Sequence, residues 1–232
     1  MFKKRGLRAK SILKRIAMLS VLGTIVFGSI PVSAASIPAA KAIPKSVQNM
    51  WPSGDKLVKI AASQVGYKAV WNSKKTGHDS VYSQFVAKKQ GKPIENGWCS
   101  EFASWCLYQI APGGSADTLS FGIKWKPAST TANFRSYYKN NTYTYVKNNK
   151  ANGKKSQISY KGLEPGMILQ INGHTAIIEK VTSSKVQVIE GNSALKENGK
   201  TYNGVRRHSY SKADIEAKTH NIISFNRHPV LN

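Results

Sequence analysis

Apolar residues recur at the spacing of an α-helix in two segments of the chain, and a third segment is expected to form a short helix. In residues 99–110, apolar side chains fall at i, i+3, i+4, i+7 and i+11, which predicts a helix with one buried face. A second helix is expected between Asp55, which would cap it, and Gly66, which would end it. A third and shorter helix is expected from Val81 to Lys89.

Beyond Gly166 the pattern changes to short apolar runs separated by turn residues. Asn172-Gly173 between two of these runs is the strongest short signal for a β-hairpin. Helices followed by such strands predict an α+β fold in which the helices pack on an antiparallel sheet. The expected strands are residues 167–171, 174–181, 185–190, 205–210 and 222–226.

Two segments lack a clear periodicity. Residues 36–52 carry three prolines among small residues, which predicts a linker. Residues 112–160 are expected to be irregular and are rich in lysine, asparagine and tyrosine. The aromatic side chains there could stack on sugars or cover an edge of the core, and the sequence leaves both open.

The first 35 residues have the organisation of a secretory signal. Seven basic residues without an acid precede an apolar run over residues 16–30, and Val32-Ser33-Ala34 gives a small-x-small cleavage pattern. A retained membrane anchor is the alternative, but a run of about 15 residues is short of the roughly 20 that span a bilayer. We therefore expect a signal peptide at 1–35, a linker at 36–52 and one domain at 53–232. The protein would be secreted or associated with a bacterial cell wall.

The chain is strongly basic, with a formal net charge of +24. Without the first 35 residues, 28 Lys and Arg still stand against 11 Asp and Glu. Such an excess on an exported protein favours anionic cell-wall polymers as partners over nucleic acid, unless it only maintains solubility. No later stretch is apolar enough to span a membrane, and we expect a monomer.

Cys99 stands where the helix 99–110 begins. The positive end of a helix stabilises a thiolate, the reactive form of cysteine, so Cys99 is a candidate nucleophile. A disulfide with Cys106 is the alternative. Seven residues of helix would separate their Cα atoms by about 10 Å, beyond the roughly 7 Å that a disulfide tolerates. The helix therefore excludes the bridge, and Cys106 is expected to be a buried apolar residue.

His174 begins one predicted strand, and Glu190 and Asn192 end the next. An odd-length turn or a bulge near residues 183–184 would place all three on one face of the sheet, whereas an even register would separate them. His174 could then take the proton of Cys99, while Glu190 and Asn192 orient the imidazole. The scattered aspartates and the isolated cysteines give no metal-binding pattern, so we expect no metal and no cofactor.

These motifs resemble the CHAP family, the cysteine, histidine-dependent amidohydrolases/peptidases. The resemblance implies a papain-like α+β fold and hydrolysis of amide bonds in the peptide part of peptidoglycan. It also implies catalytic roles for Cys99, His174, Glu190 and Asn192. It extends over about residues 55–228 and is carried by Gly97-Trp98-Cys99-Ser100-Glu101-Phe102, Pro165-Gly166, Gly173-His174-Thr175-Ala176 and Ile189-Glu190-Gly191-Asn192-Ser193.

The expected activity is that of an N-acetylmuramoyl-L-alanine amidase or an endopeptidase that acts through a thioester on Cys99. Nothing in the sequence selects between these two bonds. The alternative function is a non-catalytic protein on the same fold that binds the cell wall or a polyanion. A secreted nucleic-acid-binding protein is the third and least favoured interpretation.

Overall fold

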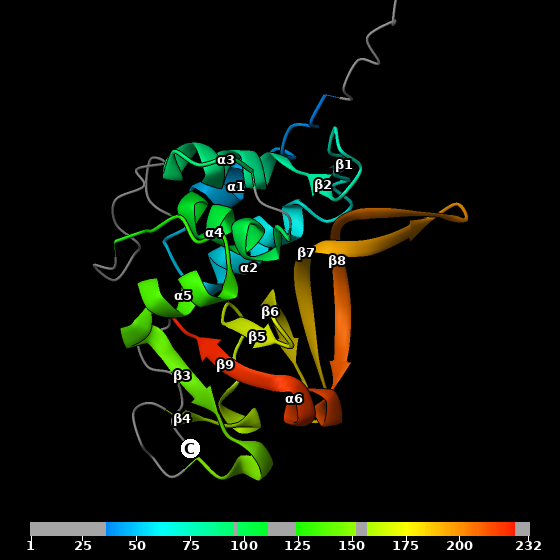
Figure 1. Ribbon diagram of the computed structural model, residues 1–232. Helices are drawn as coiled ribbons and strands as arrows, with labels where there is room; N and C mark the ends of the chain where they lie inside the picture. The colour runs from blue at the N-terminus through cyan, green and yellow to red at the C-terminus, as the bar shows by residue number, and fades with distance from the viewer. Residues whose placement is uncertain (1–35, 95–96, 111–123, 152–156, 226–232) are drawn as a thin grey trace, which may run out of the picture. The chain divides into compact units, whose positions relative to one another are not determined.

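The computed structural model describes residues 36–94, 97–110, 124–151 and 157–225. The expected signal peptide lies outside these ranges. Helices dominate the first part of the described chain and a sheet dominates the second (Figure 1). The α-helices are α1 (Lys45–Gln48), α2 (Gly54–Ser63), α3 (Val81–Gln90), α4 (Cys99–Ile110), α5 (Thr131–Tyr137) and α6 (Lys212–Lys218).

Seven strands form the large sheet in the order β4-β3-β9-β5-β6-β7-β8. Neighbouring strands are antiparallel, except for the parallel pair β3–β4 at one edge. A separate two-stranded ribbon pairs β1 (Val70–Trp71) with β2 (His78–Asp79). The sheet strands are β3 (Thr142–Tyr145), β4 (Gln157–Ile158), β5 (Ile168–Ile171), β6 (His174–Val181), β7 (Lys185–Glu197), β8 (Lys200–Ser211) and β9 (Thr219–Ile223).

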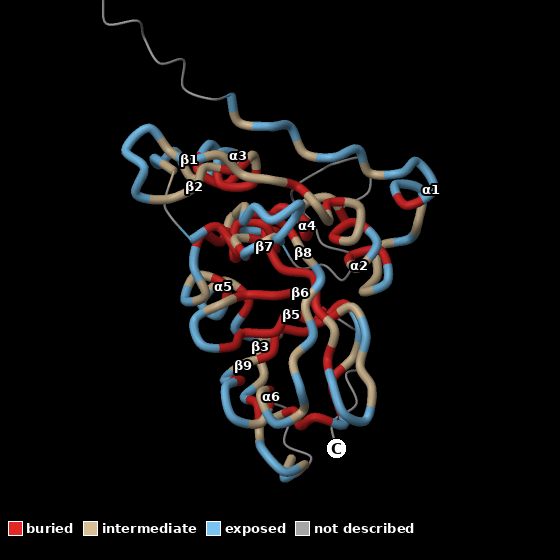
Figure 2. Tube along the Cα trace, turned by 90° about the vertical axis from the view of Figure 1, so that its right-hand side faces the viewer, coloured by how far each residue is buried: buried red, intermediate tan, exposed pale blue. Residues whose placement is uncertain are grey.

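Both faces of the central strands are buried, because alternate side chains of a strand point to opposite faces. On one face, Ile177 and Ile189 join the apolar side chains of α2, α3 and α4 in one core cluster. On the other face, Ile178 and Val188 join a second cluster that includes Ile215 of α6. Figure 2 shows the buried trace concentrated in β5, β6 and α4. The predicted α+β arrangement of helices on a largely antiparallel sheet is therefore confirmed.

The hairpin between β5 and β6 forms as its sequence predicts. Ile171 pairs with His174, and the two intervening residues, Asn172 and Gly173, both have positive φ. This is the conformation that a tight hairpin needs and that asparagine and glycine adopt most readily. The turn fixes His174 as the first residue of β6.

A second Asn-Gly turn, at Asn198-Gly199, joins β7 to β8. The strand expected to end at Glu190 continues as β7 to Glu197, and it pairs with β8 again from Ser193 onward. The two strands bend where a bulge interrupts their register between Glu190 and Ser193, and they continue as a long hairpin (Figure 1). Bulges bend strands in this way and are frequent beside functional sites.

The segment expected to be a linker is packed against the helical layer. It contains α1, whose Val47 is buried in the core, and its Lys41 backbone exchanges hydrogen bonds with the side chain of Gln64. The buried ammonium of Lys56 donates to the carbonyls of Gln48 and Met50. These contacts show that residues 36–52 are held on the domain rather than free of it.

Two further expectations need correction. Ser53 rather than Asp55 caps α2, since its hydroxyl accepts from the N–H of Lys56 at 3.1 Å. The stretch expected to be irregular holds α5, β3 and β4 in its described part. Phe134 and Tyr138 from that stretch are fully buried, so these two aromatic residues belong to the core. Over the ranges that the structure describes, no helix is long and apolar enough to cross a membrane.

Candidate active site

Cys99 is the first residue of α4, as its sequence position predicts. The helix ladder begins with the N–H of Phe102 donating to the carbonyl of Trp98 at 2.9 Å. Cys99 and Cys106 are both free thiols, so the predicted absence of a disulfide is confirmed. Cys99 is 7% exposed, whereas Cys106 lies fully inside the core, where burial raises the pKa of its thiol well above the ordinary range.

His174 reaches the thiol of Cys99 from the sheet. The imidazole and the backbone N–H groups of Thr175 and Ser100 lie close enough to the sulfur to stabilise its negative charge. The hydroxyls of Ser100 and Thr175 lie 2.8 Å apart, which joins the start of α4 to the start of β6. The helix and the strand that carry the reacting groups are therefore fastened together beside them.

Glu190 lies on the other side of the imidazole. Its Oε2 is 3.2 Å from Nε2 of His174, and its side chain is only 1% exposed. Three further groups hold the carboxylate: Nε of Arg206 and the hydroxyl of Ser193 donate to Oε1 at 2.9 Å each, and the hydroxyl of Tyr210 donates to Oε2 at 3.0 Å. A buried carboxylate with this many donors remains ionised and holds a fixed orientation.

The registers explain how His174 and Glu190 meet. Val181 pairs with Val186, so the turn between them has four residues. With this even register alone, Glu190 would lie on the face of the sheet opposite to His174. A bulge at Glu179 then shifts the register by one residue, so that Ile177 pairs with Ile189. The expectation from the sequence is an odd turn or a bulge near residues 183–184. The bulge exists but lies four residues earlier, on β6.

The electrostatics favour the charged forms of all three groups. Burial alone would raise the pKa of Cys99, but the hydrogen bond and charge of His174 and the two backbone donors outweigh it and lower that pKa below its ordinary 9.0. Burial likewise opposes a charge on His174, yet Cys99 and Glu190 raise its pKa to about 9. Burial would raise the pKa of Glu190, but His174, Arg206 and Ser193 lower it to about 2. These shifts favour a thiolate, an imidazolium and a carboxylate over the three neutral forms.

Asn192 does not join this group by hydrogen bonding. It has a φ of +55° within the bulge of β7, and its Oδ1 accepts from Nδ2 of Asn203 at 2.9 Å. No hydrogen bond among the described residues joins Asn192 to His174. Asn192, expected to be a second partner of the imidazole, is thus a residue of the bulge. Asparagine suits this position because it adopts positive φ more readily than most residues.

Arg206 and Tyr210 are two site residues that the motifs of the sequence do not indicate. Both lie on β8 and face the same carboxylate as His174. The missed signal is Asn198-Gly199, since a hairpin turn there pairs β8 with β7 and brings Arg206 opposite Glu190. Within the described ranges, no cluster of histidine, cysteine or acidic side chains could hold a metal ion.

The fold and this geometry define an α+β protein with a thiol, an imidazole and a carboxylate in one contiguous group. Residues 88–192 match the family model described as the CHAP domain. This match confirms the resemblance found in the motifs of the chain. The match includes Cys99, His174 and Glu190.

Solved structures provide a second comparison. A crystal structure of Ly7917 with the hydrolysing product of MDP is 19% identical to this chain, with a TM-score of 0.40. A further crystal structure of Ly7917 is 18% identical, with the same TM-score. Each comparison covers 74% of this chain and 62% of the Ly7917 chain, so this chain spans less than two thirds of that length. No curated protein matches the chain.

Proposed function

We propose that this protein is a secreted cysteine hydrolase that cleaves amide bonds in the peptide part of bacterial peptidoglycan. The observation that carries the proposal is the contact of Cys99 with His174 at the start of a helix, with buried Glu190 behind the imidazole. The CHAP domain at residues 88–192 supports peptidoglycan as the substrate class. The bond is that of an N-acetylmuramoyl-L-alanine amidase or of an endopeptidase.

Cys99 acts as the nucleophile. Its thiolate attacks the carbonyl carbon of the amide, and the carbonyl oxygen becomes an oxyanion near the N-terminus of α4, where backbone N–H groups and the helix dipole favour negative charge. His174 gives its proton to the leaving nitrogen as the C–N bond breaks, and a thioester to Cys99 remains. Because Nε2 faces Glu190, Nδ1 is the ring nitrogen available for this transfer.

The second half of the cycle regenerates the enzyme. Neutral His174 takes a proton from a water molecule, and the oxygen of this water attacks the thioester carbon. The C–S bond breaks, the acid is released, and the thiolate–imidazolium pair re-forms. Glu190 stabilises the imidazolium each time it appears and holds the ring in one orientation.

Digestion of purified peptidoglycan tests this function. The wild type and Cys106→Ala should release soluble peptide, while Cys99→Ala should release none and should keep its fold. Mass spectrometry of the products identifies each newly freed amino group: the N-terminus of the stem peptide marks an amidase, and an amino group within the stem or cross-bridge marks an endopeptidase. Equal release by Cys99→Ala would contradict the mechanism. Wall binding without any release by the wild type would favour the non-catalytic alternative.

We also propose export through residues 1–35, with cleavage after Ala34 or Ala35. The basic and apolar runs of that segment support this proposal. N-terminal sequencing of protein recovered from the medium or from the wall tests it. An N-terminus that still includes residue 1 would contradict it.

The basic composition supports binding to anionic wall polymers after export. Retention on walls that carry these polymers should fall steeply as salt is added, because salt screens the attraction between exposed charges. Equal retention on walls stripped of anionic polymer would contradict this part of the proposal.

A further inference from the structure

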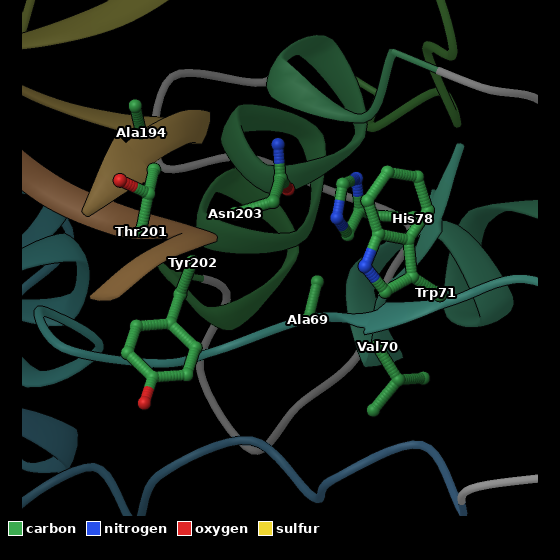
Figure 3. Close-up of a pocket in the computed structure, with 8 residues that line it drawn as sticks. All are labelled: Ala69, Val70, Trp71, His78, Ala194, Thr201, Tyr202 and Asn203. Carbon is green, nitrogen blue, oxygen red and sulfur yellow. The ribbon is translucent and has the colours of Figure 1, made fainter. Parts of the chain in front are cut away.

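A cavity of about 660 Å³ lies between the β1–β2 ribbon and the extended β7–β8 hairpin (Figure 3). Ala69 and Trp71 line it from the ribbon side, and Ala194 and Asn203 line it from the hairpin. The lining contains none of the three groups proposed for catalysis. We call this cavity the ribbon groove.

Trp71 gives the ribbon groove an exposed aromatic wall. The residue is 61% exposed, which is unusual for so large an apolar side chain. Its ring stacks on the imidazole of His78, its cross-strand partner, with centroids 4.0 Å apart and planes inclined by 34° (Figure 3). Burial lowers the pKa of His78, so the ring beneath the indole is neutral at neutral pH. The indole is thus held by its neighbour while much of its surface faces solvent.

The ribbon groove has no charged side chain in its lining, although the chain as a whole carries a net charge of +24. Its polar groups are neutral ones, including the hydroxyl of Thr201 and the amide of Asn203. Lys68 lies nearby, 4.2 Å above the ring of Tyr202, but its ammonium is paired with Glu197. An anionic ligand would require unpaired cations, so the groove suits a neutral ligand with an apolar face and several hydroxyl or amide groups.

The hairpin connects the ribbon groove to the proposed catalytic group. Asn203 in the groove donates to Asn192, which follows Glu190 by two residues. Ala194 is four residues beyond Glu190 on the same strand, about 13 Å at the usual rise of a β-strand. The groove therefore lies a short way along β7 from the carboxylate of the proposed catalytic group.

We propose that the ribbon groove binds a pyranose ring of the peptidoglycan glycan strand, stacked on Trp71. A pyranose has a face of C–H groups, which are attracted to the negative face of an aromatic ring, and a rim of hydroxyls that suit neutral polar partners. The glycan strand as ligand rests on the proposed peptidoglycan hydrolase function. The groove holds the sugar while the peptide attached to the strand extends toward Cys99.

Binding of a sugar without any peptide tests this inference. The probe is a β-1,4-linked tetramer of N-acetylglucosamine, titrated into the full-length protein and followed by isothermal calorimetry and by the NMR signal of the indole N–H. Trp71→Ala should weaken binding at least about tenfold, which corresponds to about 1.4 kcal/mol. Trp71→Tyr keeps an aromatic face and should retain most of the affinity.

Trp51→Ala is the matched control, because Trp51 is 87% exposed and does not line the groove. It should bind the tetramer as the wild type does, and circular dichroism of each variant checks the fold. No binding by the wild type, or equal binding by Trp71→Ala, would overturn the inference. A sugar-free stem peptide that binds in a Trp71-dependent manner would assign the groove to peptide instead and overturn it too. Tetramer binding by a wild type that releases nothing from peptidoglycan would contradict the proposed function but leave the sugar site standing.

Discussion

Replacing Glu190 by glutamine keeps the shape of the side chain and removes its charge. The wild-type carboxylate is buried against His174 and accepts hydrogen bonds from Arg206, Ser193 and Tyr210. An amide in its place cannot accept from all of these donors, and it leaves two buried or half-buried cations without their counter-charge. Removing one partner of a buried ion pair is strongly destabilising, so Glu190→Gln should lower the free energy of unfolding.

The pKa of Glu190 gives the size of the effect. A decrease from the ordinary 4.5 to about 2 in the folded protein corresponds to roughly 3 kcal/mol of stabilisation of the carboxylate. Since the folded pKa lies below the unfolded one, this stability is present above about pH 4.5 and is lost as the pH falls toward about 2. The difference in free energy of unfolding between the wild type and Glu190→Gln should therefore be largest at pH 7 and should decrease as the pH is lowered.

Urea unfolding followed by circular dichroism between neutral pH and about pH 3 measures this difference. Glu179→Gln is the matched control, because Glu179 pairs with Arg207 at 2.9 Å in a more exposed position on the same sheet. Glu179→Gln should lower the free energy of unfolding by less than about 1 kcal/mol, as is typical of exposed ion pairs. If Glu190→Gln loses no more free energy of unfolding than Glu179→Gln, or if its loss does not change with pH, the reasoning is refuted.

Three further predictions concern the same region. Peptide release should decline as the pH rises through about 9, because His174 loses the proton that it gives to the leaving nitrogen; a rate that still climbs above that pH would contradict this role. Tyr210→Phe removes one donor to Glu190 and should cost about 1 kcal/mol in urea unfolding, whereas an unchanged midpoint would show that the hydroxyl contributes nothing. Gly191→Ala would place a Cβ 2.6 Å from the ring of Trp98, so it should lower the free energy of unfolding by about 1 to 3 kcal/mol, and wild-type stability would contradict that packing.

The sequence predicted the elements whose signals are local. The helix starting at Cys99 follows from its apolar spacing, and the strand starting at His174 follows from the Asn-Gly turn before it. The second Asn-Gly turn carries the same signal for the β7–β8 extension. Local turn chemistry was thus sufficient for both hairpins.

The rest of the site depends on register and on contacts between distant segments. The bulge at Glu179 decides which face Glu190 occupies, and no residue type at that position marks it in advance. Arg206 and Tyr210 reach the carboxylate only because β8 pairs with β7. The same dependence on tertiary packing explains why a proline-rich segment expected to be a linker instead packs on the helices, where Val47 enters the core.

The central claim is that His174 lowers the pKa of the Cys99 thiol and so favours its ionised form. Ultraviolet absorbance of the thiolate, recorded against pH for the wild type and corrected with Cys99→Ser, measures this ionisation directly. The account predicts a midpoint for Cys99 below the ordinary 9.0, and an upward shift of that midpoint in His174→Ala. A midpoint at or above 9.0 in the wild type, or one that His174→Ala leaves unchanged, would contradict it.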